Sequence, residues 1–105
     1  MRIGAALDAL DFAVSGMPNL DRRRRLETYA MTQVVVERLR AIGRARALSA
    51  SLINAQLLKI QFSVETLAGL AGGHASDEQQ LADVRAALSA LTGPDCFGPH
   101  LEASE

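Results

Sequence analysis

The chain has 105 residues and a formal net charge of −1, which is material for one domain and no more. Apolar residues make up 49% of it and charged residues 22%, a balance that excludes a chain disordered throughout. Among the apolar residues 18 are Ala and 15 are Leu, whereas Val and Ile together supply only 10. Because Ala and Leu favour helices and β-branched residues favour strands, we predict an all-α fold.

The sequence offers little to suggest a membrane protein or a secreted one. No stretch approaches the ~20 uninterrupted apolar residues that a membrane-spanning helix needs. Asp8 and Asp11 interrupt the N-terminal apolar run, where a secretion signal should be uncharged. Cys96 is the single cysteine and cannot form an intrachain disulfide. We therefore expect a cytoplasmic protein, of bacterial type.

The first expected helix covers about residues 3–17. Its apolar positions recur at spacings of four and three, which places them along one side of a helix. Gly16 and Pro18 follow as residues that stop a helix. The members of this stripe are Ile3, Leu7, Leu10, Val14 and Met17.

The second expected helix begins near Asn19 or Asp21, whose side chains can accept hydrogen bonds from the first free amides. A turn over residues 47–51 should end it, because one helix continuing to residue 71 would be about 75 Å long. A domain this small could not cover such a helix. The polar face is expected at Gln33, Glu37, Arg40 and Arg44. The expected core stripe is Met31, Val35, Leu39 and Ile42, widened by Val34 and Val36.

The third expected helix, from Ser51 to Ala71, is apolar on two faces. The first face is a core stripe of Ile53, Leu57, Ile60, Val64, Leu67 and Ala71. The second face holds Ala55, Leu58, Phe62 and Gly69. A helix that is apolar on two faces needs neighbours on both. Either the other helices of this chain cover the second face, or another subunit or protein does.

The fourth expected helix has the clearest limits. Gly72, Gly73 and His74 should end the third helix, and a capping box from Ser76 to Gln79 should open the fourth. Its stripe is Leu81, Val84, Leu88 and Leu91, and the expected stop is Thr92, Gly93 and Pro94. We therefore predict one helical domain over residues 1–94 and a loosely ordered tail over residues 95–105.

Motifs for catalysis or metal binding are missing from the sequence. It has no Gly-rich phosphate loop, nucleophile elbow, HExxH or pair of CxxC motifs. His74, Cys96 and His100 could meet around zinc, but they lack a clear fourth ligand and lie in loops or the tail. Asp77 and Glu78 are interpreted as acids that stabilise a helix start. We expect no enzyme activity, no cofactor and no metal.

Basic residues are concentrated in the first half of the chain. Residues 1–46 carry a formal charge of +4, and residues 47–105 carry −5. Four consecutive arginines at the start of the second helix oppose its dipole and suggest a compensating partner, either nucleic-acid phosphate or an acidic protein surface. Arg38 and Arg46 extend this region. The basic patch consists of Arg22, Arg23, Arg24, Arg25, Arg40 and Arg44.

The predicted architecture is a small four-helix domain with two long central antiparallel helices, assembled as a dimeric helical bundle. We predict a non-enzymatic protein–protein interaction module, such as a small regulator or anti-activator that binds a transcription factor through an apolar helix face. Ala55, Leu58, Phe62 and Gly69 would form the partner or dimer interface. The alternative is a small nucleic-acid-binding regulator that uses the basic patch. A small helical enzyme would need a buried polar cluster, which the spacing does not reveal.

Overall fold

The computed structural model describes residues 1–71 and 76–103, and this part of the chain forms four α-helices, two short 3-10 helices and no strand. The α-helices are α1 (Ile3–Ser15), α2 (Arg22–Ala45), α3 (Ala50–Leu67) and α4 (Asp77–Leu91). The 3-10 helices are η1 (Met17–Asn19) and η2 (Gly98–His100). The prediction of an all-α fold with four helices is confirmed.

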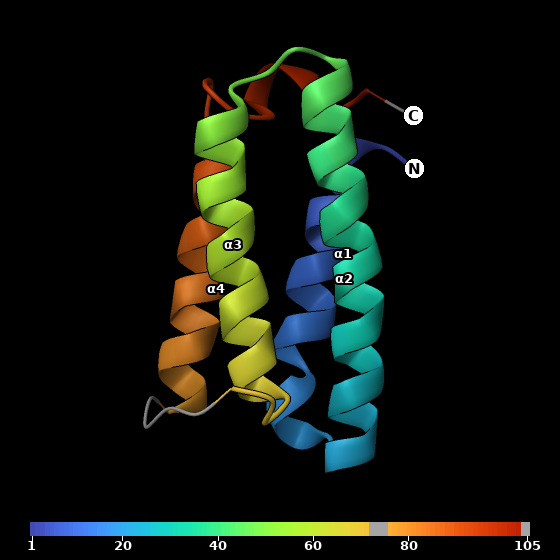
Figure 1. The fold of residues 1–105 in the computed structure, drawn as a ribbon, viewed down its shortest axis with the longest axis vertical. Coiled ribbons are helices and arrows are strands. Elements are labelled where there is room, and N and C mark those ends of the chain that lie inside the picture. Colours follow the sequence, from blue (N-terminus) through green and yellow to red (C-terminus); the bar gives the residue numbers. More distant parts are fainter. Residues whose placement is uncertain (72–75, 104–105) are drawn as a thin grey trace.

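Successive helices run antiparallel, and the bundle closes as a ring because α4 also packs against α1 (Figure 1). α2 and α3 are the longest helices, with 24 and 18 residues, and lie side by side. Each helix has two main neighbours in this ring. The long pair is therefore antiparallel, as predicted, but it is no more central than α1 and α4.

The helices begin and end largely where the turn and capping residues lie in the sequence. The Asp21 carboxylate accepts the backbone N–H of Arg24 at 2.9 Å and starts α2. The Ser76 hydroxyl accepts the backbone N–H of Gln79 at 3.2 Å and starts α4. The turn between α2 and α3 contains Ala47 at a φ of 55°. These three predicted boundaries are confirmed, although the Gln79 side chain donates to Asp83 and does not complete a capping box.

The end of α3 was predicted wrongly. Gly69 adopts a φ of +77°, its N–H donates to the Thr66 carbonyl, and the N–H of Leu70 donates to the Glu65 carbonyl. This pair of hydrogen bonds is a Schellman motif, which needs a residue in the left-handed region. The helix therefore ends at Leu67. The predicted stop at Gly72, Gly73 and His74 lies outside the described residues.

The core stripes of α1 and α3 lie where the sequence places them, except that Ala71 falls beyond the end of α3, but the stripe of α2 is rotated. Met31 and Val34 were predicted as core and are 45% and 66% exposed. Thr32 and Val36 occupy the buried side, together with Leu39 and Ile42. Thr32 can be buried because its hydroxyl donates to the Tyr29 carbonyl at 2.8 Å. This rotation turns part of the predicted polar face toward α3.

Residues 95–103 pack onto the bundle, in contrast to the loosely ordered tail that the sequence predicts. Phe97 is completely buried and Cys96 nearly so. The carbonyls of Leu101 and Ala103 accept the N–H groups of Gly4 and Ile3 at 2.8 and 3.0 Å. The first amides of a helix have no partner within it, and this segment supplies partners for α1. The last two residues, 104–105, lie outside the described part.

Gln80 gives the first testable prediction. Its side chain is buried at the start of α4, and its Oε1 atom has no hydrogen-bond partner. Gln80→Met keeps the volume and removes this unsatisfied group, so we expect the free energy of unfolding to rise by about 1–2 kcal/mol. Urea denaturation would measure it. The exposed neighbour Gln79→Met serves as control and should change stability by less than about 0.5 kcal/mol. A lower midpoint for Gln80→Met would contradict the prediction.

Candidate functional site

An exposed apolar groove lies between α3 and α4. It encloses about 660 Å³ and has Leu58 and Phe62 at its α3 edge. The side chains of Leu58 and Phe62 are 59% and 60% exposed, so the bundle leaves them largely uncovered. The complete lining is Gln56, Leu58, Lys59, Phe62, Ser63, Asp83, Ala86, Ala87 and Ala90. We refer to this feature as the α3/α4 groove.

The groove follows from the two apolar faces of α3. Its core stripe points into the bundle, so Phe62, half a turn away from that stripe, points outward. A ring of four helices covers only one side of each member. Ala55 is also exposed on this side. Gly69 was predicted to share the face, but it lies in the turn after α3 and carries the left-handed backbone of the Schellman motif.

The α4 side of the groove was not predicted from the sequence. Ala86 and Ala90 are exposed there and present only methyl groups, with the buried Ala87 between them, so a second chain could approach the backbone of α4 closely. The spacing of these alanines is the signal that could have revealed them, because Ala86 and Ala90 are one helical turn apart. Lys59 and Asp83 add one charge of each sign to the lining. The site therefore combines apolar anchors, small residues and a sparse polar rim.

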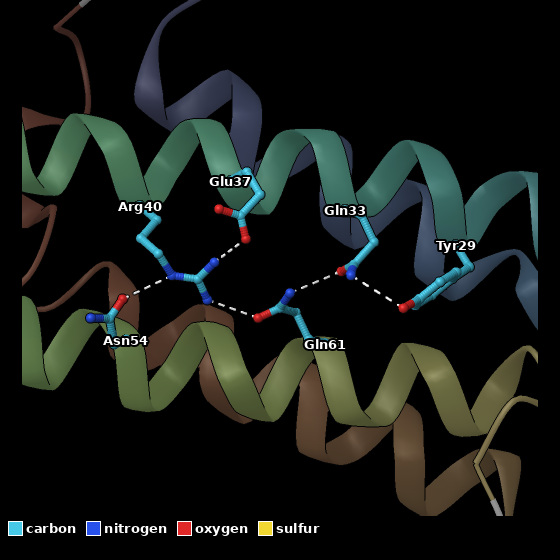
Figure 2. A network of polar contacts seen from close by, with 6 residues as sticks. All are labelled: Tyr29, Gln33, Glu37, Arg40, Asn54 and Gln61. Atoms are coloured by element: carbon cyan, nitrogen blue, oxygen red, sulfur yellow. Dashed lines mark hydrogen bonds and ion pairs between the residues drawn. The ribbon is translucent and has the colours of Figure 1, made fainter.

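A polar network joins α2 to α3 on another side of α3 (Figure 2). Arg40 donates from Nη2 to Gln61 Oε1 at 2.8 Å, and Gln61 donates from Nε2 to Gln33 Oε1 at 3.1 Å. Gln33 then donates to the Tyr29 hydroxyl, which donates to the Glu65 carboxylate, both at 3.2 Å. The hydrogen bonds run in one direction from a guanidinium to a carboxylate. Each amide thus both donates and accepts within the interface.

The remaining contacts of Arg40 complete this network. Its Nε donates to Asn54 Oδ1 at 3.0 Å, and its Nη1 pairs with the Glu37 carboxylate. Gln33 pairs with Gln61, and Tyr29, four residues before Gln33, pairs with Glu65, four residues after Gln61. This opposite order is what antiparallel helices require. Sliding one helix by a turn would break these pairs together. The network therefore fixes the register of α2 and α3.

Tyr29 is the titratable group that this arrangement perturbs. Partial desolvation raises the pKa of its phenol above the ordinary value, and the hydrogen bond to the Glu65 carboxylate acts in the same direction. A raised pKa keeps the hydroxyl protonated and able to donate.

The predicted basic patch is divided by the structure. The Arg25 side chain donates to the carbonyls of Pro18, Leu20 and Leu67, at 2.9, 3.0 and 3.1 Å, and lies 3.7 Å from the Asp77 carboxylate. It therefore joins the η1 turn to the end of α3, where carbonyls are free to accept. Arg40 belongs to the polar network.

The other basic residues are spread along α2. Arg22, Arg23 and Arg24 are exposed in its first turn, where Arg23 pairs with Glu27 at 3.3 Å. Arg44 is exposed about 30 Å away, near the other end of the helix. Arg38 and Arg46 have interaction partners as well. These arginines do not gather on one surface.

A second exposed aromatic residue, Phe12 on α1, was not singled out from the sequence. It is 85% exposed and lies beside a groove of about 830 Å³ between α1 and α2. Its position half a turn away from the α1 stripe could have indicated this exposure. In the described part of the chain, an exposed aromatic side chain thus lies at each of two grooves, Phe62 between α3 and α4 and Phe12 between α1 and α2.

The three residues that were considered for zinc do not form a described site. His74 lies outside the described residues, and residues 1–71 and 76–103 contain no group of three or more His, Cys, Asp or Glu side chains placed to hold a metal ion. Cys96 is buried, and this burial raises the pKa of its thiol, with Asp95 contributing in the same direction. The thiol is therefore held in its protonated, less reactive form.

None of the described helices combines the length and the apolar character needed to cross a membrane. Comparison of the chain with protein-family models, curated proteins and solved structures gives no match. The class of protein is thus defined by its own geometry: a four-helix bundle with an exposed apolar groove.

Proposed function

We propose that this protein is a non-enzymatic protein–protein interaction module that binds an apolar helix of a partner protein in the α3/α4 groove. The observation that carries this proposal is the exposure of Leu58 and Phe62 beside the alanines of α4. Amphipathic helices insert apolar side chains into grooves of this kind. Leu58 and Phe62 would act as anchors, and Lys59 and Asp83 would fix the orientation of the incoming helix.

A regulatory role is the specific form of the proposal. A small bundle that binds one helix can occupy the dimerisation helix of a transcription factor, and it would then act as an anti-activator. The proposed regulator would act in the cytoplasm, the location that the sequence predicts.

The proposal is tested by photo-crosslinking in the cells that express the protein. The photoreactive analogue p-benzoylphenylalanine, placed at Phe62, should give one dominant adduct with another protein, because its side chain lies at the groove edge. The matched control is the same analogue at Val34, which is exposed on α2 away from the groove. Adding Leu58→Asp should lower the yield of the Phe62 adduct by about tenfold or more, the effect of losing an interface anchor.

Three results would contradict this function. They are no adduct from position 62, the same adducts from position 34, or a yield that Leu58→Asp leaves unchanged. Far-UV circular dichroism of the Leu58→Asp variant provides the folding control. We expect native helicity, because this side chain is exposed in the wild type.

Nucleic-acid binding is the alternative that the sequence raised. The separation of Arg24 from Arg44 and the internal contacts of Arg25 and Arg40 give it no specific support, so we do not propose it. It remains a prediction with a simple test. Binding to duplex DNA or RNA at about 50 mM salt, falling steeply as salt is added, would favour it.

A further inference from the structure

Phe12 is the most exposed large apolar side chain in the described part of the molecule. It projects from the face of α1 opposite the buried stripe of that helix. The groove beside it is also lined by Leu20 and Thr28, which come from the start of the neighbouring α2 region. Thr28 and Met31 lie three residues apart on one side of α2, and Met31 is 45% exposed. We refer to Phe12, the groove beside it and the exposed Met31 on α2 as the Phe12 face.

Charges of opposite sign flank Phe12 along the axis of the bundle. Asp8 lies one turn before Phe12 on α1 and lines the same groove. Arg24 lies one turn before Thr28 on α2, and its side chain is exposed. Figure 1 shows that α1 runs toward the end of the bundle at which α2 begins. Asp8 comes one turn before Phe12 on α1 and is therefore farther from that end, whereas Arg24 belongs to the first turn of α2, at that end.

We infer that the Phe12 face is the site where a second copy of this chain docks, in an antiparallel arrangement about a twofold axis near Phe12. A twofold axis places each side chain against the matching region of the other copy. Phe12 would then pack against Phe12 of the second copy. Asp8 would face Arg24 of the second copy, and the reverse pair would form by symmetry.

The arrangement of charges specifies this occupant. A face with an acid at one end and a base at the other is complementary to a second copy of itself in antiparallel orientation, because each acid then faces a base. Two such pairs set the register of the dimer, while Phe12 and Leu20 supply apolar area; Asp11, which also lines the groove, accepts a hydrogen bond from the Ser15 hydroxyl of its own helix. The inference goes beyond the proposed function, because it places the expected homodimer on α1 and α2 and leaves the α3/α4 groove open to a partner.

Sedimentation velocity on the purified full chain, as a concentration series, tests the inference. We expect the wild type to reach twice the 11.2 kDa chain mass. Phe12→Ser should sediment as a monomer with native helicity, since the side chain is exposed and its loss leaves the core intact. The control Phe62→Ser should remain dimeric. This comparison separates the dimer surface from the groove of the proposed function.

A charge exchange tests the register independently. Asp8→Arg alone and Arg24→Asp alone should each raise the dimer dissociation constant by about tenfold, because each creates two repulsive pairs. The double variant restores opposite charges and should return the constant to near the wild-type value. A wild type that stays monomeric up to about 1 mM would overturn the inference. So would a dimer lost with Phe62→Ser but kept with Phe12→Ser, or a double variant that is no better than the single ones.

Discussion

Replacing Phe97 by Ala should lower the free energy of unfolding by about 3–5 kcal/mol, the usual cost of truncating a buried aromatic residue. Phe97 is completely buried in the hydrophobic core, and its N–H also donates to the Leu91 carbonyl at 2.9 Å. Phe97→Ala would leave a cavity in this core, and the cost of the cavity adds to the lost burial of the ring. For a domain of this size, such a loss is a large part of the total stability.

The matched control for Phe97→Ala is Phe62→Ala, which removes the same atoms from an exposed position. We expect it to change the unfolding free energy by less than about 0.5 kcal/mol. Urea denaturation followed by circular dichroism, at low protein concentration, would measure both variants. Equal midpoints for the two variants would show that residues 95–103 do not contribute to the core.

Replacing Arg25 by Met should lower the free energy of unfolding by about 2–3 kcal/mol, because three carbonyls lose a charged hydrogen-bond donor. Two of these carbonyls belong to Pro18 and Leu20, around η1, and the third belongs to Leu67 at the end of α3. The Met side chain retains the apolar packing of the Arg stem, so the measured loss reports mainly the hydrogen bonds.

Arg24→Met provides the comparison for Arg25→Met, since it removes the same charge from the neighbouring, exposed residue. It should change stability by less than about 0.5 kcal/mol at concentrations that keep the protein monomeric. Arg25→Lys should recover less than half of the loss, because one ammonium group cannot reach all three carbonyls. If both arginine-to-methionine variants unfold at the same urea concentration, Arg25 has no special role.

The sequence predicts most of the fold because most of its signals are local. The stripes of α1 and α3 and the caps at Asp21 and Ser76 depend on spacings of three or four residues, which a helix translates directly into position. The end of α3 was predicted wrongly because three glycines, Gly69, Gly72 and Gly73, could each end the helix. The capping hydrogen bonds form at Gly69, the earliest of them in the chain. Local pattern alone does not decide such a competition.

The rotation of α2 had a different cause. Three consecutive valines, from Val34 to Val36, allow more than one apolar stripe, and the choice between them depends on α3. Gln33 and Arg40 have partners in Gln61 and Asn54, so the side that carries them faces α3 and Val34 faces outward. Side-chain pairing between helices is a tertiary effect that overrides a weak periodic signal.

The candidate site was predictable on α3 but not on α4. Leu58 and Phe62 form a second apolar face that the spacing in the sequence reveals. The alanines of α4 become part of the groove only because α4 packs beside α3. Arg25 shows the same limit. Its place in a run of four arginines suggested a surface patch, and only the fold brings it to the Leu67 carbonyl. The sequence shows that a residue is charged, but only the fold determines whether its side chain faces solvent.

The contact between residues 95–103 and α1 has a consequence for synthesis. All four helices leave the ribosome before Phe97 does, yet the core lacks this side chain, and the first amides of α1 lack the Leu101 and Ala103 carbonyls, until residues 97–103 emerge. A nascent chain with only residues 1–94 outside the exit tunnel would therefore be helical but incompletely packed. Completion of the fold is coupled to emergence of the last part of the domain.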